Sequence, residues 1–173
     1  LLIDVEKAYD RVSWVYLHQC IKAAGFGPYI AKWMQTLYPL NAEDQIKVHG
    51  RVLYDTHAQA IQRRIVVNGE LSPLVTLKCG VAQGDPLSCL LYILSDESNH
   101  IMLRMHTELH GIPLPARAGR RGRHAVSSGF ADDTAVYVTT MHEMSTVQAI
   151  LDAFCNISGQ KVNWSKCMAL ALG

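Results

Sequence analysis

Residues 125–139 read AVSSGFADDTAVYVT, and this stretch decides the fold because it predicts two strands with acids between them. The runs 125–130 and 134–139 contain valine, tyrosine, threonine and phenylalanine, residue types that favour strands. Residues 131–133, which separate the two runs, read Ala-Asp-Asp. The sequence therefore predicts an antiparallel hairpin that carries two carboxylates at its tip.

A second acidic strand end is predicted at the start of the chain. Residues 1–5 are apolar apart from Asp4, which suits a buried strand whose end opens onto a site. Phosphoryl transfer with two metal ions uses carboxylates from separate strands, because Mg²⁺ prefers oxygen ligands. Taken alone, a pair such as Asp132 and Asp133 at a turn is more often a solvated turn, since aspartate suits turns. Only the fold could bring Asp4 to this pair.

Four helices are predicted from capping residues and from apolar positions at helical spacing. In the third, Asp85 is a cap, Pro86 stands in the first turn, and Gly111 is expected to mark the end. Gly159 suits the position that follows the fourth helix. The predicted helical spans are 13–25, 28–37, 85–111 and 143–158.

The remaining segments predict strands, turns and one insertion. Strand-like pieces occupy 45–48 and 65–67, and Asn68-Gly69 is a strong turn sequence. Residues 41–64 are polar without sustained periodicity, so we interpret them as an insertion on the surface with few core contacts. A last strand is expected at 167–172. The order of elements predicts an α+β fold, an antiparallel sheet with helices on one face in a split βαβ arrangement.

Bulk composition limits the function classes. The 173 residues match one domain, and 49% hydrophobic against 18% charged residues indicates a folded chain. The net charge of +1 gives no general argument for an anionic partner. The sequence has five widely spaced cysteines, no leader and no long apolar run. These features predict an intracellular protein that neither is secreted nor enters a membrane. The apolar first residues suggest that the chain was cut from something longer.

Four stretches carry a resemblance to a known family. DVEKAYD at 4–10, GVAQGDPLS at 80–88 and FADD at 130–133 resemble the first three palm motifs of reverse transcriptases from non-LTR (LINE-type) retrotransposons. GQKVNWSK at 159–166 is similar to the fourth motif. The motifs occur in the family's order and cover most of the chain. The resemblance implies a polymerase palm with a ferredoxin-like core and RNA-directed DNA polymerase activity on an RNA template, a DNA primer and deoxynucleoside triphosphates.

The resemblance also implies a catalytic metal site. Asp4 and Asp132 would be the principal ligands of two Mg²⁺ or Mn²⁺ ions, with Asp133 beside them. The alternative for Asp4 is an aspartate at a helix entry. We expect the three carboxylates to converge at one end of the sheet, because two ions about 3.5–4 Å apart must be held from both sides.

Nucleotide-binding roles follow from the same resemblance. Tyr9 would pack under the sugar of the incoming nucleotide and exclude a 2′-hydroxyl, and we expect it to face the acidic cleft above Gln83 and Gly84. Gln83 and Gly84 would meet the nascent base pair, and Lys166 would approach the triphosphate. The alternatives are a core tyrosine, an ordinary loop before a helix and a solvated lysine.

Other charged groups allow weaker interpretations. A basic loop could contact nucleic-acid phosphates, although such a run is more often solvated. His106 and His110 stand four residues apart, but Thr107 occupies the place where a metalloprotease zinc motif requires glutamate, so we assign these histidines to the surface. Asp85 is interpreted as structural. The loop arginines are Arg117, Arg120, Arg121 and Arg123.

Rival functions remain open at this point. Ala82 stands where relatives often have arginine and Cys89 where they often have proline, so one rival is an inactive relic of a palm. A non-catalytic nucleic-acid-binding module is another. A nucleotide cyclase or nuclease also uses acidic strand ends, but residues 83–88 argue against both. Relatives carry fingers before the first motif and a thumb after the fourth, and neither is visible in these 173 residues.

Overall fold

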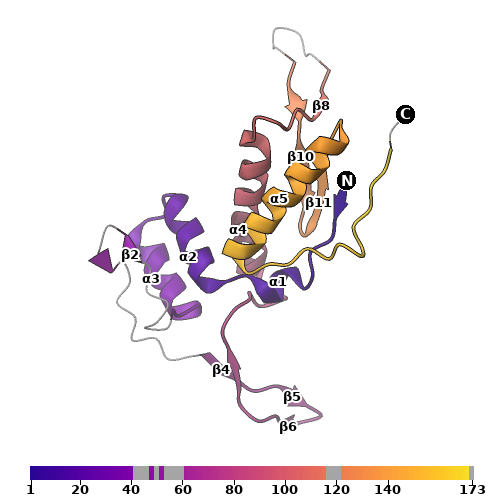
Figure 1. Ribbon diagram of the computed structural model, residues 1–173. Coiled ribbons are helices and arrows are strands. Elements are labelled where there is room, and N and C mark those ends of the chain that lie inside the picture. The colour runs from indigo at the N-terminus through magenta and orange to yellow at the C-terminus, as the bar shows by residue number, and fades with distance from the viewer. Residues whose placement is uncertain (41–46, 49–50, 53–60, 116–121, 172–173) are drawn as a thin grey trace.

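The computed structural model describes residues 1–40, 47–48, 51–52, 61–115 and 122–171. Within them, five helices and eleven short strands form a mixed α+β fold (Figure 1). The helices are α1 (Ala8–Arg11), α2 (Trp14–Ala23), α3 (Pro28–Leu37), α4 (Pro86–Met105) and α5 (Met141–Ser158). The strands are β1 (Leu2–Ile3), β2 (Lys47–Val48), β3 (Arg51–Val52), β4 (Ile61–Arg63), β5 (Val66–Val67), β6 (Glu70–Leu71), β7 (Val75–Leu77), β8 (Ile112–Pro113), β9 (His124–Ala125), β10 (Ser127–Phe130) and β11 (Asp133–Val136).

The main sheet has three antiparallel strands in the order β1-β11-β10. Strand periodicity explains its two faces, since alternate residues point to opposite sides. In β11, Thr134 and Val136 are buried, whereas Asp133 is exposed. The buried face, with Ile3 from β1, packs against helix α5 in one hydrophobic cluster. The hairpin predicted from 125–139 is therefore confirmed, and one face of it is free for chemistry.

Helix α4 connects two hydrophobic clusters. Its first half contributes Leu91 and Tyr92 to a cluster with α2 and α3, and its second half contributes Leu103 to the cluster behind the sheet. Asp85 caps this helix, because its carboxylate accepts a hydrogen bond from the Leu87 N–H at 2.9 Å. The structural interpretation of Asp85 is thus confirmed.

The end of helix α4 differs from the prediction. The helix stops at Met105, and His106 is already extended with ψ of 124°. Gly111 instead has φ of +63° and lies so close to β9 that a Cβ atom would be 2.2 Å from the Ala125 carbonyl oxygen. This glycine therefore allows the close approach of two backbones and does not end a helix. His106 and His110 consequently do not share a helical face.

Two other predictions concern short strands. Met168 forms one isolated bridge with Leu2, so the predicted strand at 167–172 is wrong over its described residues. The chain turns at 163–166, and after this turn only Met168 pairs with strand β1. The Asn68-Gly69 turn is confirmed between β5 and β6, with φ of 52° and 85°. Most of the predicted insertion at 41–64 lies outside the described residues, but Ile61–Arg63 pairs with β7.

No helix among the described residues is long and apolar enough to cross a membrane.

Candidate active site

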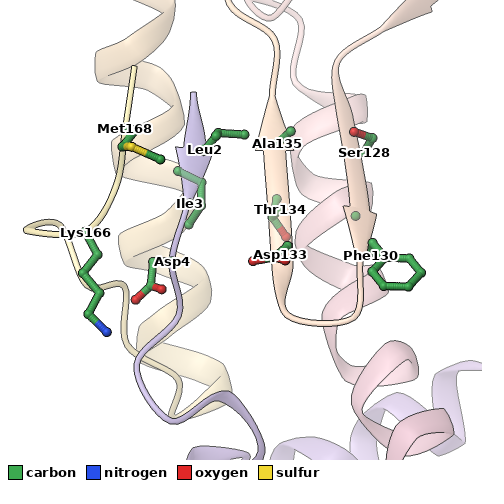
Figure 2. Close-up of a pocket in the computed structure, with 11 residues that line it drawn as sticks. Leu2, Ile3, Asp4, Ser128, Phe130, Asp133, Thr134, Ala135, Lys166 and Met168 are labelled. Atoms are coloured by element: carbon green, nitrogen blue, oxygen red, sulfur yellow. The ribbon is translucent and has the colours of Figure 1, made fainter. Parts of the chain in front are cut away.

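Asp4 and Asp133 line one pocket on the open face of the main sheet (Figure 2). The register pairs Leu2 with Ala135 and Ile3 with Thr134, so one further step places Asp4 beside Asp133. Both residues line this pocket, which we call the acidic pocket, and Figure 2 shows the Asp4 carboxylate directed toward Lys166. The lining includes Asp4, Asp133, Ser128, Phe130, Lys166 and Met168. The sheet therefore unites an acid from the first motif with one from the third.

The fourth motif is joined to the first by backbone hydrogen bonds. The Glu6 N–H donates to the Lys161 carbonyl at 2.8 Å, and the Asn163 N–H donates to the Asp4 carbonyl at 2.8 Å. A turn then follows, because the Lys166 N–H donates to the Asn163 carbonyl at 2.9 Å. This turn places the Lys166 side chain beside Asp4 in the acidic pocket (Figure 2). A cation thus shares the pocket with two carboxylates.

Asp132 lies at the exposed tip of the hairpin and is not among the residues that line the acidic pocket. The backbone at Ala131 is left-handed, with φ of 55°, which makes the tight turn. The Asp132 charge raises the pKa of the Tyr92 hydroxyl, after the larger effects of burial and Asp96. Among residues 1–40, 61–115 and 122–171, no three His, Cys, Asp or Glu side chains gather closely enough to hold a metal ion. The structure therefore brings together two of the three predicted ligands.

The donor set of the acidic pocket suits a hard divalent cation. Asp4 and Asp133 offer carboxylate oxygens, the ligand type that Mg²⁺ and Mn²⁺ prefer. Magnesium keeps several waters and is commonly held by one or two carboxylates together with substrate phosphates. Two carboxylates that line one open pocket offer oxygen ligands for that mode of binding.

Tyr9 lies on the other side of strand β10, in a second pocket. We call it the tyrosine pocket, and its lining includes Tyr9, Cys89, Asp96, His100, Phe130 and Ala131. The Tyr9 ring stacks on Tyr92 with centroids 4.7 Å apart and an interplanar angle of 14°. A hydrogen bond with Cys89, then burial, then the charges of Cys89 and Asp132 raise the pKa of the Tyr9 hydroxyl. Aromatic stacking therefore fixes this ring on helix α4.

The second motif is attached to the first through its backbone. The Val81 N–H donates to the Tyr9 carbonyl and the Gly80 N–H to the Val12 carbonyl, both at 2.8 Å. The Gln83 amide donates weakly to the Asp10 carboxylate at 3.4 Å. Gln83 and Gly84 are exposed, and Gln83 lines a different pocket from Tyr9. Tyr9 and Gln83 thus line separate pockets, while the charge of Asp132 reaches the Tyr9 hydroxyl, and a shared cleft for Tyr9, Gln83 and the acids stays a prediction.

Several residues near the hairpin were not predicted. Asp96 and His100 on helix α4 form a buried pair, and His100 also contacts Ser127 of β10. The available sequence signal was an aspartate and a histidine four residues apart, a spacing that places both on one face of a helix. Of the predicted basic loop, Arg123 is described and exposed. Arg117, Arg120 and Arg121 lie outside the described residues.

Comparisons with known proteins agree with this geometry. Residues 1–171 match the family model described as reverse transcriptase (RNA-dependent DNA polymerase). The chain is also 30% identical over all 173 residues to the Transposon TX1 uncharacterized 149 kDa protein of Xenopus laevis, of which it spans 11% of the length. The resemblance found in the four motifs is thus confirmed at the level of the family. The chain belongs to the reverse transcriptase (RNA-dependent DNA polymerase) family.

Proposed function

We propose that this chain is the palm region of an RNA-directed DNA polymerase carried by a non-LTR retrotransposon. The observation that carries the proposal is the meeting of Asp4, Asp133 and Lys166 in one pocket from three segments far apart in sequence. The three-stranded sheet with α4 and α5 behind it is compatible with the split βαβ palm. Family membership and the similarity to a transposon protein support the reaction class and the element type.

The proposed reaction is transfer of a deoxynucleotide to a primer. The primer 3′-hydroxyl gives its proton to water and attacks the α-phosphorus of the triphosphate, the new phosphodiester bond forms, and pyrophosphate leaves with the electrons of the broken phosphorus–oxygen bond. Asp4, Asp132 and Asp133 would hold two divalent ions. When bound, such ions supply charge neutralisation of the triphosphate and activation of the hydroxyl.

The chain's own residues would then position the reactants. Lys166 would place its ammonium group against the triphosphate or the departing pyrophosphate, beside the acids. The Tyr9 ring, held on Tyr92, would pack under the sugar and exclude a 2′-hydroxyl. Gln83 and Gly84 would meet the nascent base pair. Template RNA, primer DNA and deoxynucleoside triphosphates are therefore the proposed partners.

Metal binding by the chain tests the site directly. We expect Mn²⁺, titrated calorimetrically, to bind the parent and to bind Asp4→Asn and Asp133→Asn roughly tenfold or more weakly, because each variant loses a charged ligand. Asp152→Asn, an exposed position on α5, is the matched control and should bind like the parent. Equal affinity in all four proteins would remove the chemical basis of the proposal.

Primer extension tests the activity of the chain. We expect no extension of a labelled primer on an RNA template by these 173 residues alone, because misplacement of the reacting groups by about 1 Å can cost roughly a hundredfold in rate. A version joined to fingers and thumb from a relative should extend the primer, and its Asp132→Asn variant should not. Robust extension by the chain alone would contradict this prediction.

A palm that retains the fold without catalysis is the second candidate. Ala82 and Cys89 depart from the family motif, and Asp132 lies outside the acidic pocket. This candidate predicts normal Mn²⁺ binding but no extension by the version with added fingers and thumb. A non-catalytic nucleic-acid-binding module would instead keep salt-dependent RNA binding in Asp132→Asn without needing the metal.

A further inference from the structure

Strand β10 contacts a histidine of helix α4, His100. His100 is 8% exposed, its Nδ1 lies 2.8 Å from the Ser127 Oγ, and its Nε2 lies 3.3 Å from Asp96 Oδ2. A neutral imidazole satisfies both contacts when its Nε2–H donates to Asp96 and its Nδ1 accepts from the Ser127 hydroxyl. Buried polar groups are costly unless they are paired, so this arrangement fixes the orientation of the ring.

The ring occupies the space that a side chain at position 129 would need. The Cβ position of Gly129 faces helix α4, and a Cβ built there would lie 2.6 Å from His100 Nε2 and 3.1 Å from its Cε1. The φ of Gly129 is not in the left-handed region, so the need for glycine here comes from space alone. The imidazole therefore contacts the strand backbone three residues before Asp132.

Helix α4 relates this contact to the rest of the candidate site. The helix begins directly after Gln83 and Gly84, carries Tyr92 under the Tyr9 ring, and ends beyond His100. Helix α4 thus sets the position of the predicted base-pair contacts and of Tyr9. It also sets the position of the β10–β11 hairpin with Asp132 and Asp133, which we call the acidic hairpin. A change at His100 would move the hairpin relative to the other groups without touching any of them.

We propose that His100, with Asp96 and Ser127, is a positioning residue that fixes the distance between the acidic hairpin and helix α4. The inference rests on the proposed function, because the position of the hairpin matters only if its acids hold metal and substrate. A buried ion pair is weak evidence of a contribution to stability. The contact of the imidazole with the Gly129 backbone instead indicates a role in positioning strand β10.

Hydrogen exchange separates local positioning from general stability. In His100→Leu, the amides of the hairpin tip at 130–134 should exchange about tenfold faster, whereas those of helix α5 at 147–154 should change little, because local opening is independent of global unfolding. His142→Leu, a histidine with a 77% exposed side chain, is the matched control and should leave both regions unchanged. Equal acceleration in both regions, or none, would overturn the proposal.

A compensating pair tests the steric contact. Gly129→Ala should weaken Mn²⁺ binding, because the new methyl group displaces β10 from the imidazole, and His100→Ala should weaken it, because β10 loses its contact with helix α4. The double variant should lose clearly less affinity than the two single losses added together. Coupling of this kind is expected only for residues in contact. Additive losses in the double variant would contradict the proposed contact. If the parent itself shows no binding that depends on Asp133, the proposed function fails, and hydrogen exchange alone decides the role of His100.

Discussion

Two hairpins of this chain are built alike at their turns and differ in what lies behind them. Both β10–β11 and β5–β6 are antiparallel with two-residue turns, and both turns include a left-handed residue. The first is backed by α4 and α5, and Val136 is fully buried in it. The second lies at the end of an arm directed away from these helices (Figure 1), where Val66 and Val67 are 64% and 60% exposed.

The difference shows what makes a hairpin suitable for chemistry. A turn sequence alone produces the pairing, but it fixes no position relative to the rest of the molecule. Only the hairpin with a buried face holds a carboxylate, that of Asp133, in register with Asp4. We expect substitutions in the two regions to differ accordingly.

The largest contrast should come from truncating a leucine. Leu151→Ala, at a residue 1% exposed behind the sheet, should lower the free energy of unfolding by about 3 kcal/mol, because it leaves a cavity in the core. Leu71→Ala, at a residue 60% exposed in the arm, should change it by less than about 0.5 kcal/mol. Urea unfolding measures both. Similar losses would mean that Leu71 in the arm is packed as tightly as Leu151 in the core behind the main sheet.

A smaller contrast is expected at two glycines with the same backbone conformation. Gly80 and Gly69 have φ of +86° and +85°, but only at Gly80 would a Cβ meet backbone, 2.7 Å from the Asp10 carbonyl oxygen. Gly69→Ala should therefore cost about 1–2 kcal/mol from backbone strain alone. Gly80→Ala should lower the free energy of unfolding distinctly more, because the backbone at Gly80 and the backbone at Asp10 must move apart. Thermal unfolding of both variants would reveal whether the two losses are instead equal.

The smallest effect concerns pH and a buried carboxylate at the start of α5. Burial alone would raise the pKa of Glu143, but hydrogen bonds from the Thr139 N–H and hydroxyl and from His110 lower it overall. Its contribution to stability is therefore fully present above the unfolded value of 4.5 and is lost as pH falls through the lower folded pKa. Glu143→Gln should flatten the dependence of unfolding free energy on pH in this acidic range.

Thr139→Val is the companion variant for this pH prediction. It keeps the backbone donor and removes the hydroxyl that lies 2.8 Å from Glu143 Oε1, so it should flatten the curve only partly. An unchanged curve in Glu143→Gln would show that other groups govern acid stability. The arm has no part in this network and should not alter it.

The sequence predicted local features well. Caps, helical spacing and turn residues correctly indicated α2, α3, the start of α4, α5 and both hairpins. It also placed Asp4 and the hairpin acids at strand ends, and Asp4 and Asp133 share a pocket. These predictions depend on interactions between neighbours in the chain, which a single sequence records directly.

Features that depend on distant segments were missed. Helix α4 ends at Met105, six residues before Gly111, and the role of Gly111 is a close approach to Ala125 that the sequence does not record. Whether Asp132 or Asp133 faces Asp4 depends on the register of β1 against β11, and a shift by one residue would reverse the faces. The role of His100 requires the helix to lie under β10. No local pattern encodes these three contacts.

The pairing of β1 with β11 also has a consequence for how the protein is made. Leu2 of β1 pairs with Ala135 of β11, 133 positions later, so β1 leaves the ribosome long before its partner strand. At a synthesis rate of about 5–20 residues per second, this wait lasts on the order of ten seconds. During that time Leu2 and Ile3 have no partner strand, and an unpaired apolar strand favours aggregation. Folding of the acidic pocket is therefore a late event, completed only after the hairpin has been synthesised.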